Sequence, residues 1–183
     1  MSYEVHTVET APEGARETLA GAAKAYGFLP NLLGVMAEAP ALVKAYRAAA
    51  DLFEETSLTP SERQIVLLTV SYENGCEYCV AAHSVIAGMQ KVPADVVQAI
   101  RIGQPIADGK LEALRRFVSA MVVTRGLPSE ADTQALLNAG YAQAQTLEVV
   151  LGIGLKTLSN YTNHVAETPL DQAFGPASWK KTR

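Results

Sequence analysis

Residues Thr59–Met89 read TPSERQIVLLTVSYENGCEYCVAAHSVIAGM, a stretch that contains both cysteines of the chain and one of its three histidines. The first half predicts a helix, because Thr59 with Glu62 three residues later forms a capping box ahead of an apolar run. Asn74-Gly75 is a turn dipeptide that ends this helix. A second helix is expected from about Cys76 to Gly88, so the stretch predicts a helical hairpin.

The second helix of this hairpin gathers three reactive side chains on one face. Cys76 and Cys79 are three residues apart, and Cys79 and His83 are four apart, so all three lie in one stripe. Unpaired backbone N–H groups at a helix N-terminus favour a thiolate. With an imidazole nearby they can lower a cysteine pKa from about 8.5 into a range of roughly 3.5–7.5.

Three interpretations of this C-x-x-C-x-x-x-H stripe are open. In the first, the cysteines are small buried residues and His83 is a core histidine. In the second, the three side chains bind zinc. In the third, the cysteine pair is redox-active. Zinc needs a fourth ligand, which His164 or Glu73 would have to supply, and three ligands on one helix face fit a tetrahedral site poorly. We favour the redox interpretation, in which a thiolate attacks a peroxide and the second cysteine closes a disulfide. His83 would accept the proton of Cys79 as a general base, because the spacing pairs these two residues.

The composition is that of a globular protein with a substantial core, since 49% of the 183 residues are hydrophobic and 19% are charged. A net charge of −4 favours neither nucleic acid nor an anionic membrane surface as a partner. The N-terminus has early glutamates and no apolar run, and no segment resembles a membrane span, so we expect a cytoplasmic protein. In that compartment a C-x-x-C is more often redox-active or metal-binding than structural.

Helical periodicity continues through the rest of the chain and predicts an all-α bundle of about eight helices. Further helices are expected at residues 13–28, 31–39, 41–55, 93–102, 108–125, 129–138 and 146–166. We expect one domain over residues 1–183, with residues 1–12 and 173–183 as peripheral tails. There is no Gly-rich phosphate loop, and the hypothesised chemistry needs no cofactor or metal. The runs Ile65–Val70 and Leu147–Leu155 are apolar on more than one side, which indicates a homo-oligomer.

The segment ENGCEYCVAAHSVIAG resembles the active-site segment of the AhpD-like alkylhydroperoxidases, in the carboxymuconolactone decarboxylase superfamily. Three flanking segments resemble that family too, and the likeness spans about residues 25–172: GFLPNLLGVMAEAP, LTPSERQIVLL and SNYTNHVAETPLD. The resemblance implies an all-helical fold, assembly into trimers or hexamers, and thiol-dependent reduction of hydroperoxides by an external dithiol reductant. It also implies that Cys79 is the attacking thiol and Cys76 the resolving one.

The chain departs from the family pattern at one position. A Glu twelve residues before the first Cys relays protons through the His in that family, and here Gln64 stands in its place. Gln can hydrogen-bond an imidazole and fix its tautomer, but it carries no charge. We expect Glu73 to be the relay carboxylate, with Glu62 as second choice. The alternative roles are a solvated turn residue for Glu73 and capping for Glu62.

Three more side chains are interpreted as structural. Tyr78 lies on the face opposite Cys76, where packing is expected. His164 falls near the end of the last long helix, where a cation is favourable in itself. His6 is expected at the surface.

Competing functions remain beside the hypothesis of a thiol peroxidase for small hydroperoxides. One is a dithiol oxidoreductase or redox-sensing oligomer that does not turn over peroxide. Another is a lactone decarboxylase, which the intact cysteine pair disfavours because that reaction needs no dithiol. A metal-binding or interaction module is the last.

Overall fold

The computed structural model describes residues 3–181, and every regular element in that range is helical. The elements are α1 (Glu13–Tyr26), α2 (Asn31–Met36), α3 (Pro40–Glu54), α4 (Pro60–Glu73), α5 (Glu77–Met89), α6 (Ala94–Arg101), α7 (Gly109–Val123), α8 (Glu130–Asn138), α9 (Gln143–Ala166) and the 3₁₀ helix η1 (Gln172–Ala177). The all-α prediction is therefore confirmed. The expected boundaries differ by up to three residues, for example at α9, which begins at Gln143 rather than Thr146.

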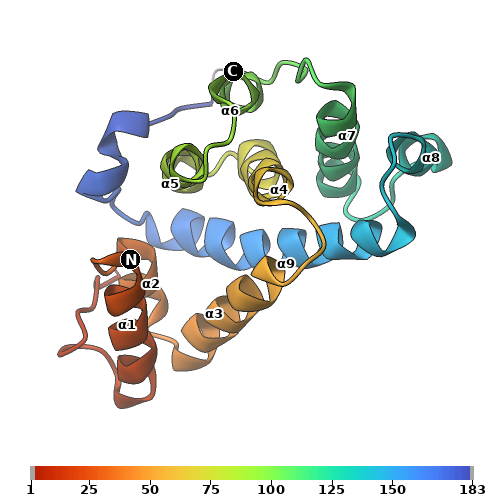
Figure 1. Cartoon of the computed structure of the whole chain (residues 1–183). Coiled ribbons are helices and arrows are strands. Elements are labelled where there is room, and N and C mark those ends of the chain that lie inside the picture. The colour runs from red at the N-terminus through yellow and green to blue at the C-terminus, as the bar shows by residue number, and fades with distance from the viewer. Residues whose placement is uncertain (1–2, 182–183) are drawn as a thin grey trace.

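Helix α9 is the axis of the molecule. It crosses the whole structure, with α1–α3 on one side and α4–α8 on the other (Figure 1). It packs against α3 and α4 and also meets α2, α5 and α7. A residue on the inner face of α9 therefore reaches helices from both halves of the chain.

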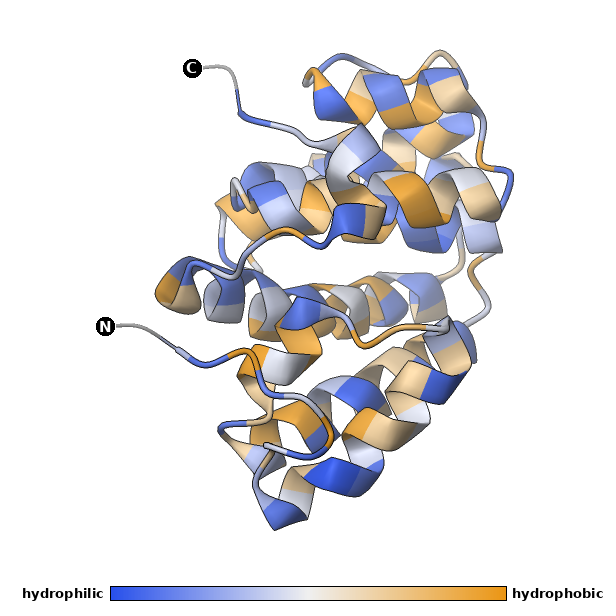
Figure 2. Ribbon diagram, turned by 90° about the vertical axis from the view of Figure 1, so that its left-hand side faces the viewer, coloured by the Kyte–Doolittle hydropathy of each residue, from blue (hydrophilic) through white to orange (hydrophobic). Residues whose placement is uncertain are grey.

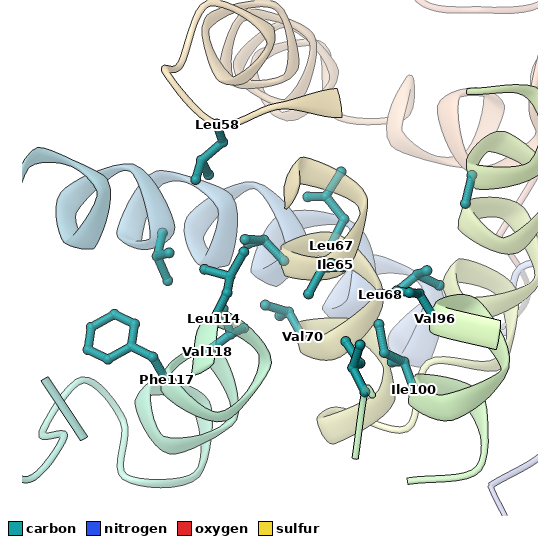
Figure 3. Packing of buried hydrophobic residues seen from close by; sticks show 14 of the residues in the cluster. Leu58, Ile65, Leu67, Leu68, Val70, Val96, Ile100, Leu114, Phe117 and Val118 are labelled. Carbon is teal, nitrogen blue, oxygen red and sulfur yellow. The ribbon is translucent and has the colours of Figure 1, made fainter. Parts of the chain in front are cut away.

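Helix α4 is buried on nearly all sides. Residues 64–71 are all buried, because α5, α6, α7 and α9 surround the helix. Figure 3 shows side chains of α4 such as Leu68 and Val70 between Ile100 of α6 and Leu114 of α7. The apolar run Ile65–Val70 thus packs inside the chain, so it leaves no apolar face for another subunit.

The other apolar run keeps an exposed side. Val149 and Leu155 are buried, whereas Leu147 is 71% and Val150 47% exposed. Hydrophobic and hydrophilic residues alternate along nearly every helix (Figure 2), as expected where one face packs inward. The expectation of a homo-oligomer therefore rests on the exposed residues of α9.

A second apolar cluster holds the cysteines. Cys76 and Cys79 pack with side chains of α1, α2 and α3, together with Phe174 of η1. The core residues of this cluster are Ala11, Ala15, Leu19, Ala22, Leu32, Leu33, Met36, Ala37, Val43, Cys76, Tyr78, Cys79, Ala81, Ala82 and Phe174. The thiols therefore lie in apolar surroundings, which disfavour ionisation unless polar groups compensate.

The segments expected as tails are partly packed. Phe174 of η1 is buried, and Trp179 Nε1 donates to the Arg101 carbonyl at 2.8 Å. His6 was expected at the surface but is buried, with Nε2 at 2.7 Å from the Glu38 carboxylate. The surface prediction for His6 is wrong, because the N-terminal segment folds back over α2, where His6 N donates to the Gly34 carbonyl.

Candidate active site

The turn between α4 and α5 sets the position of the first cysteine. Gly75 has φ 68°, a conformation that favours glycine, and Cys76 follows as the N-cap of α5. The Cys76 sulfur accepts the backbone N–H of Cys79 at 3.4 Å. The first cysteine thus caps the helix on which the second cysteine stands.

Both thiols are free, and each is only 1% exposed. One amide from α9 spans them: Asn163 Nδ2 lies 3.2 Å from Cys79 Sγ and 3.7 Å from Cys76 Sγ. A single donor within reach of both sulfurs requires that the two side chains converge, as closure of a disulfide would need. The donor is nearer to Cys79 and favours the charged form of that sulfur.

The two thiols differ in acidity. Burial opposes ionisation of Cys79, but a hydrogen bond from the Cys76 thiol and the charge of Lys156 outweigh it. With help from Asn160 and Ser159, these groups lower the pKa of Cys79 to about 5. The same hydrogen bond, together with burial, raises the pKa of Cys76. At neutral pH Cys79 is therefore the thiolate and Cys76 the thiol.

His83 links two helices through its ring. Its Nδ1 lies 3.0 Å from Gln64 Oε1 on α4, and its Nε2 lies 3.0 Å from Lys156 Nζ on α9. Because the amide oxygen only accepts, Nδ1 donates and Nε2 accepts from the lysine. Desolvation and the Lys156 charge lower the pKa of His83 well below its usual value, so the ring is neutral.

Lys156, Asn160 and Asn163 were not predicted from the sequence, and all three are buried. Their signal is the spacing along α9: they continue the inward face begun by Val149 and Gly152 at intervals of three and four residues. A lysine on the apolar face of a helix is rarely buried without a function, because its charge must be compensated.

The two carboxylates expected to serve His83 point elsewhere. Glu73 accepts from Ser119 Oγ of α7 at 2.6 Å. Glu62 forms the capping box with Thr59 and an ion pair with Lys110 at 3.4 Å. Within residues 3–181 neither carboxylate has a hydrogen bond or ion pair to His83. The capping role of Glu62 is confirmed, and Gln64 takes the contact with the imidazole.

Two other side chains are structural. Tyr78 is buried, and its hydroxyl donates to the Asp171 carboxylate and accepts from the Leu32 N–H at 3.3 Å. His164 is exposed and stacks on Tyr161. Both observations agree with the structural roles expected from the sequence.

Two negative findings hold for the part of the chain that the structure describes. No three side chains among its His, Cys, Asp and Glu residues gather as a metal ion would require. No helix there combines the length and apolar character needed to cross a bilayer.

Comparison with known proteins agrees with this architecture. Residues 37–120 match the family model of the carboxymuconolactone decarboxylase family. No curated protein sequence matches the chain.

Solved structures share the fold. A protein of Ralstonia eutropha JMP134, described as an alkylhydroperoxidase AhpD core and an uncharacterized peroxidase-related protein, has a TM-score of 0.81 at 23% identity, over 98% of this chain and 97% of that one. A peroxidase-related protein of Silicibacter sp. TM1040 has a TM-score of 0.79 at 17% identity, over 95% and 92%. The debrominase Bmp8, solved with 2,3,4-tribromopyrrole, has a TM-score of 0.76 at 18% identity, over 90% and 89%. These proteins share the fold, and their descriptions range from peroxidase-related to debrominase.

Proposed function

We propose that the chain, an AhpD-like member of the carboxymuconolactone decarboxylase superfamily, is an enzyme that reduces organic hydroperoxides through a Cys76–Cys79 dithiol cycle. One observation carries the proposal: an acidic Cys79 lies beside a neutral Cys76, with Asn163 Nδ2 within reach of both sulfurs. The pair differs in protonation as an attacking and a resolving thiol must.

The first step is attack on the peroxide. The Cys79 thiolate forms a bond to the terminal oxygen of ROOH while the O–O bond breaks, giving a sulfenic acid and an alkoxide. The alkoxide takes up a proton and leaves as the alcohol. Cys79 loses two electrons, and the peroxide gains them.

The second step closes the disulfide. The Cys76 sulfur attacks the Cys79 sulfenic acid, the S–S bond forms, and the hydroxyl leaves as water with the thiol proton. An external dithiol then reduces the disulfide by exchange and is itself oxidised. The convergence of both sulfurs on Asn163 supports this step.

Proton transfer is assigned to the Gln64–His83–Lys156 chain rather than to a carboxylate. The sequence-based hypothesis made His83 the acceptor of the Cys79 proton, directly or through one water. In the structure Nε2 of His83 contacts Lys156 Nζ, and Lys156 acts electrostatically on Cys79. We therefore route the proton between Cys79 and His83 through Lys156, and the ammonium is the donor to the leaving alkoxide.

A dithiol oxidoreductase without peroxidase turnover is the second candidate. The observation that favours it is the acidic Cys79 beside a neutral Cys76, which serves thiol–disulfide exchange as well as attack on a peroxide. Reduction of glutathione disulfide or insulin by the reduced protein, without consumption of hydroperoxide, would favour this alternative.

The test is turnover of cumene hydroperoxide with dithiothreitol, dihydrolipoamide or reduced thioredoxin. Wild type should consume the peroxide, and Cys79→Ser should not. Without reductant, Cys76→Ser should react once and stop at the Cys79 sulfenic acid, which dimedone traps for mass spectrometry. Full turnover by Cys79→Ser would remove Cys79 as the attacking thiol, and no turnover by wild type with any reductant would remove the peroxidase function.

A further inference from the structure

Lys156 is a buried cation for which no carboxylate provides a counter-ion. Its side chain is on the inner face of α9 and the residue is only 1% exposed. Within residues 3–181 no carboxylate lies within ion-pair distance of its Nζ, although Lys110, Arg47, Arg63 and Arg115 all have such partners. An ammonium taken out of water is costly unless an anion compensates it.

The contact with His83 does not supply that anion. Nζ lies 3.0 Å from Nε2, and the neutral imidazole offers a lone pair but no charge. On the far side of the ring Gln64 contributes an uncharged amide. The chain of contacts that begins at Lys156 therefore ends without a negative group.

The cysteine pair is the remaining source of negative charge. Asn163 stands seven residues after Lys156, on the same face of α9, and reaches both sulfurs. Besides Cys76, titratable groups that act electrostatically on or with Cys79 include Tyr46 of α3, Tyr78 of α5 and Lys156 of α9. Both tyrosines have raised pKa values and stay neutral. The Asp171 carboxylate accepts from the Tyr78 hydroxyl and from the Asn31 N–H, so we assign the thiolate as the anion that faces the ammonium.

We propose that Lys156 is the resident counter-ion of the Cys79 thiolate, and that loss of this ion pair on oxidation makes the Cys76–Cys79 disulfide a strong oxidant that reductants readily reduce. The proposal rests on the assignment of Cys79 as the thiolate of the proposed dithiol cycle. It explains how the site works with Gln64 where a carboxylate would otherwise stand: a cation that stabilises the thiolate takes the place of a base that would deprotonate the thiol.

Reduction of the Cys76–Cys79 disulfide conserves electrons and protons. An external dithiol gives two electrons and two protons and becomes a disulfide. The protein S–S bond breaks, Cys76 takes one proton, and the other is released because Cys79 stays a thiolate beside Lys156. In the disulfide neither sulfur is charged, so the ammonium has lost its anion. Stabilisation of the reduced form by a thiolate raises a reduction potential in this way.

The experiment measures thiolate and potential without peroxide. Lys156→Met keeps an unbranched side chain and removes the charge, and Lys156→Gln serves if the first variant does not fold. Lys156→Arg keeps the charge, and the exposed Lys44→Gln is the surface control. The pH dependence of iodoacetamide alkylation reports the thiolate, and equilibration with glutathione reports the potential.

We expect the neutral variants to raise the Cys79 pKa by at least about one unit and to shift the glutathione equilibrium at least tenfold toward the disulfide, about 30 mV. Lys156→Arg should recover most of both, and Lys44→Gln should match wild type. An unmoved alkylation profile and potential in the neutral variants would overturn the counter-ion role. If the neutral variants show these shifts but wild type consumes no hydroperoxide, the peroxidase function alone would be overturned.

Discussion

The Nζ of Lys156 and the Nε2 of His83 lie 3.0 Å apart, and this contact joins α9 to α5 at the level of the cysteine pair. A histidine whose Nε2 accepts from an ammonium is not free to take a proton from a thiol directly. The chain of Gln64, His83 and Lys156 therefore positions a cation beside Cys79, where a carboxylate relay would have positioned a base. The experiments below separate these two modes of activation.

The pH dependence of the alkylation rate of the reduced protein should be that of an acidic thiol. Since the Cys76 thiol donates to Cys79 and lowers its pKa to about 5, the rate should stay nearly flat from pH 8 to 6 and fall below that. Cys76→Ala removes this donor, so the decline should move to higher pH. Mass mapping of the modified residue checks that Cys79 is the one labelled. A profile centred near pH 8.5 in wild type would contradict the assignment of the thiolate.

Stability of the reduced protein should rise with pH between about 6.8 and 8. The folded pKa of Cys79 is about 5 and the unfolded value about 8.5, so the unfolded chain binds more protons in this window. The gain is at most about 1.4 kcal/mol per pH unit and is lost as pH falls toward 5. His83, whose folded pKa is lowered, adds a dependence only below about 6.5, outside the window.

Urea unfolding at several pH values measures this dependence. Cys79→Ser and the oxidised wild type both lack the thiolate, so neither should show the rise over the same window. An equal slope in Cys79→Ser would assign the effect to another group.

Asn163→Ala should weaken the thiolate, and its loss of stability should be limited to that of the thiolate hydrogen bond. The amide nitrogen reaches both sulfurs, and Oδ1 is buried with no hydrogen-bond partner in the described range, so the substitution removes no accepted bond. A hydrogen bond to a charged group contributes roughly 1.5–3 kcal/mol, which corresponds to a rise of about one to two units in the pKa of Cys79.

The pH dependence of alkylation, beside unfolding curves, checks this expectation. Asn138→Ala, at the exposed end of α8, is the matched control and should leave the alkylation profile unchanged. A fall in stability with no change in the profile would make Asn163 a packing residue only.

Close packing of α9 on α3 and α4 makes a paired glycine test possible. A Cβ at Gly152 would lie 2.7 Å from Val66 Cγ1 and 2.9 Å from the Phe53 ring, whereas one at Gly154 would meet no atom within 4 Å. Gly152→Ala should therefore destabilise by about 1–3 kcal/mol. Gly154→Ala, on the exposed side of the same helix, should stabilise by up to about 1 kcal/mol. Thermal unfolding of both variants checks the pair, and equal effects would contradict the packing.

The sequence predicted the hairpin and the stripe of Cys76, Cys79 and His83 because capping, turn chemistry and helical spacing are local. It assigned the relay to Glu73 because that residue is near the thiols along the chain. Glu73 follows Gln64 by nine residues, about two and a half turns, so it faces the opposite side of α4. Lys156 was not predicted as a site residue because it is 73 residues from its partner His83, and only the fold brings such residues together.

Gln64→Glu should weaken the site rather than repair it. The residue is buried, and its side-chain oxygen contacts Nδ1 of His83. A carboxylate there would favour a charged imidazole, which repels the Lys156 ammonium, and it would compete with Cys79 for the positive charge. The pKa of Cys79 should rise, and an NMR titration should show that of His83 rising as well. Gln134→Glu, exposed on α8, is the control. An increase in hydroperoxide turnover at pH 7, with an unchanged alkylation profile, would instead support the carboxylate relay and reduce Lys156 to a structural role.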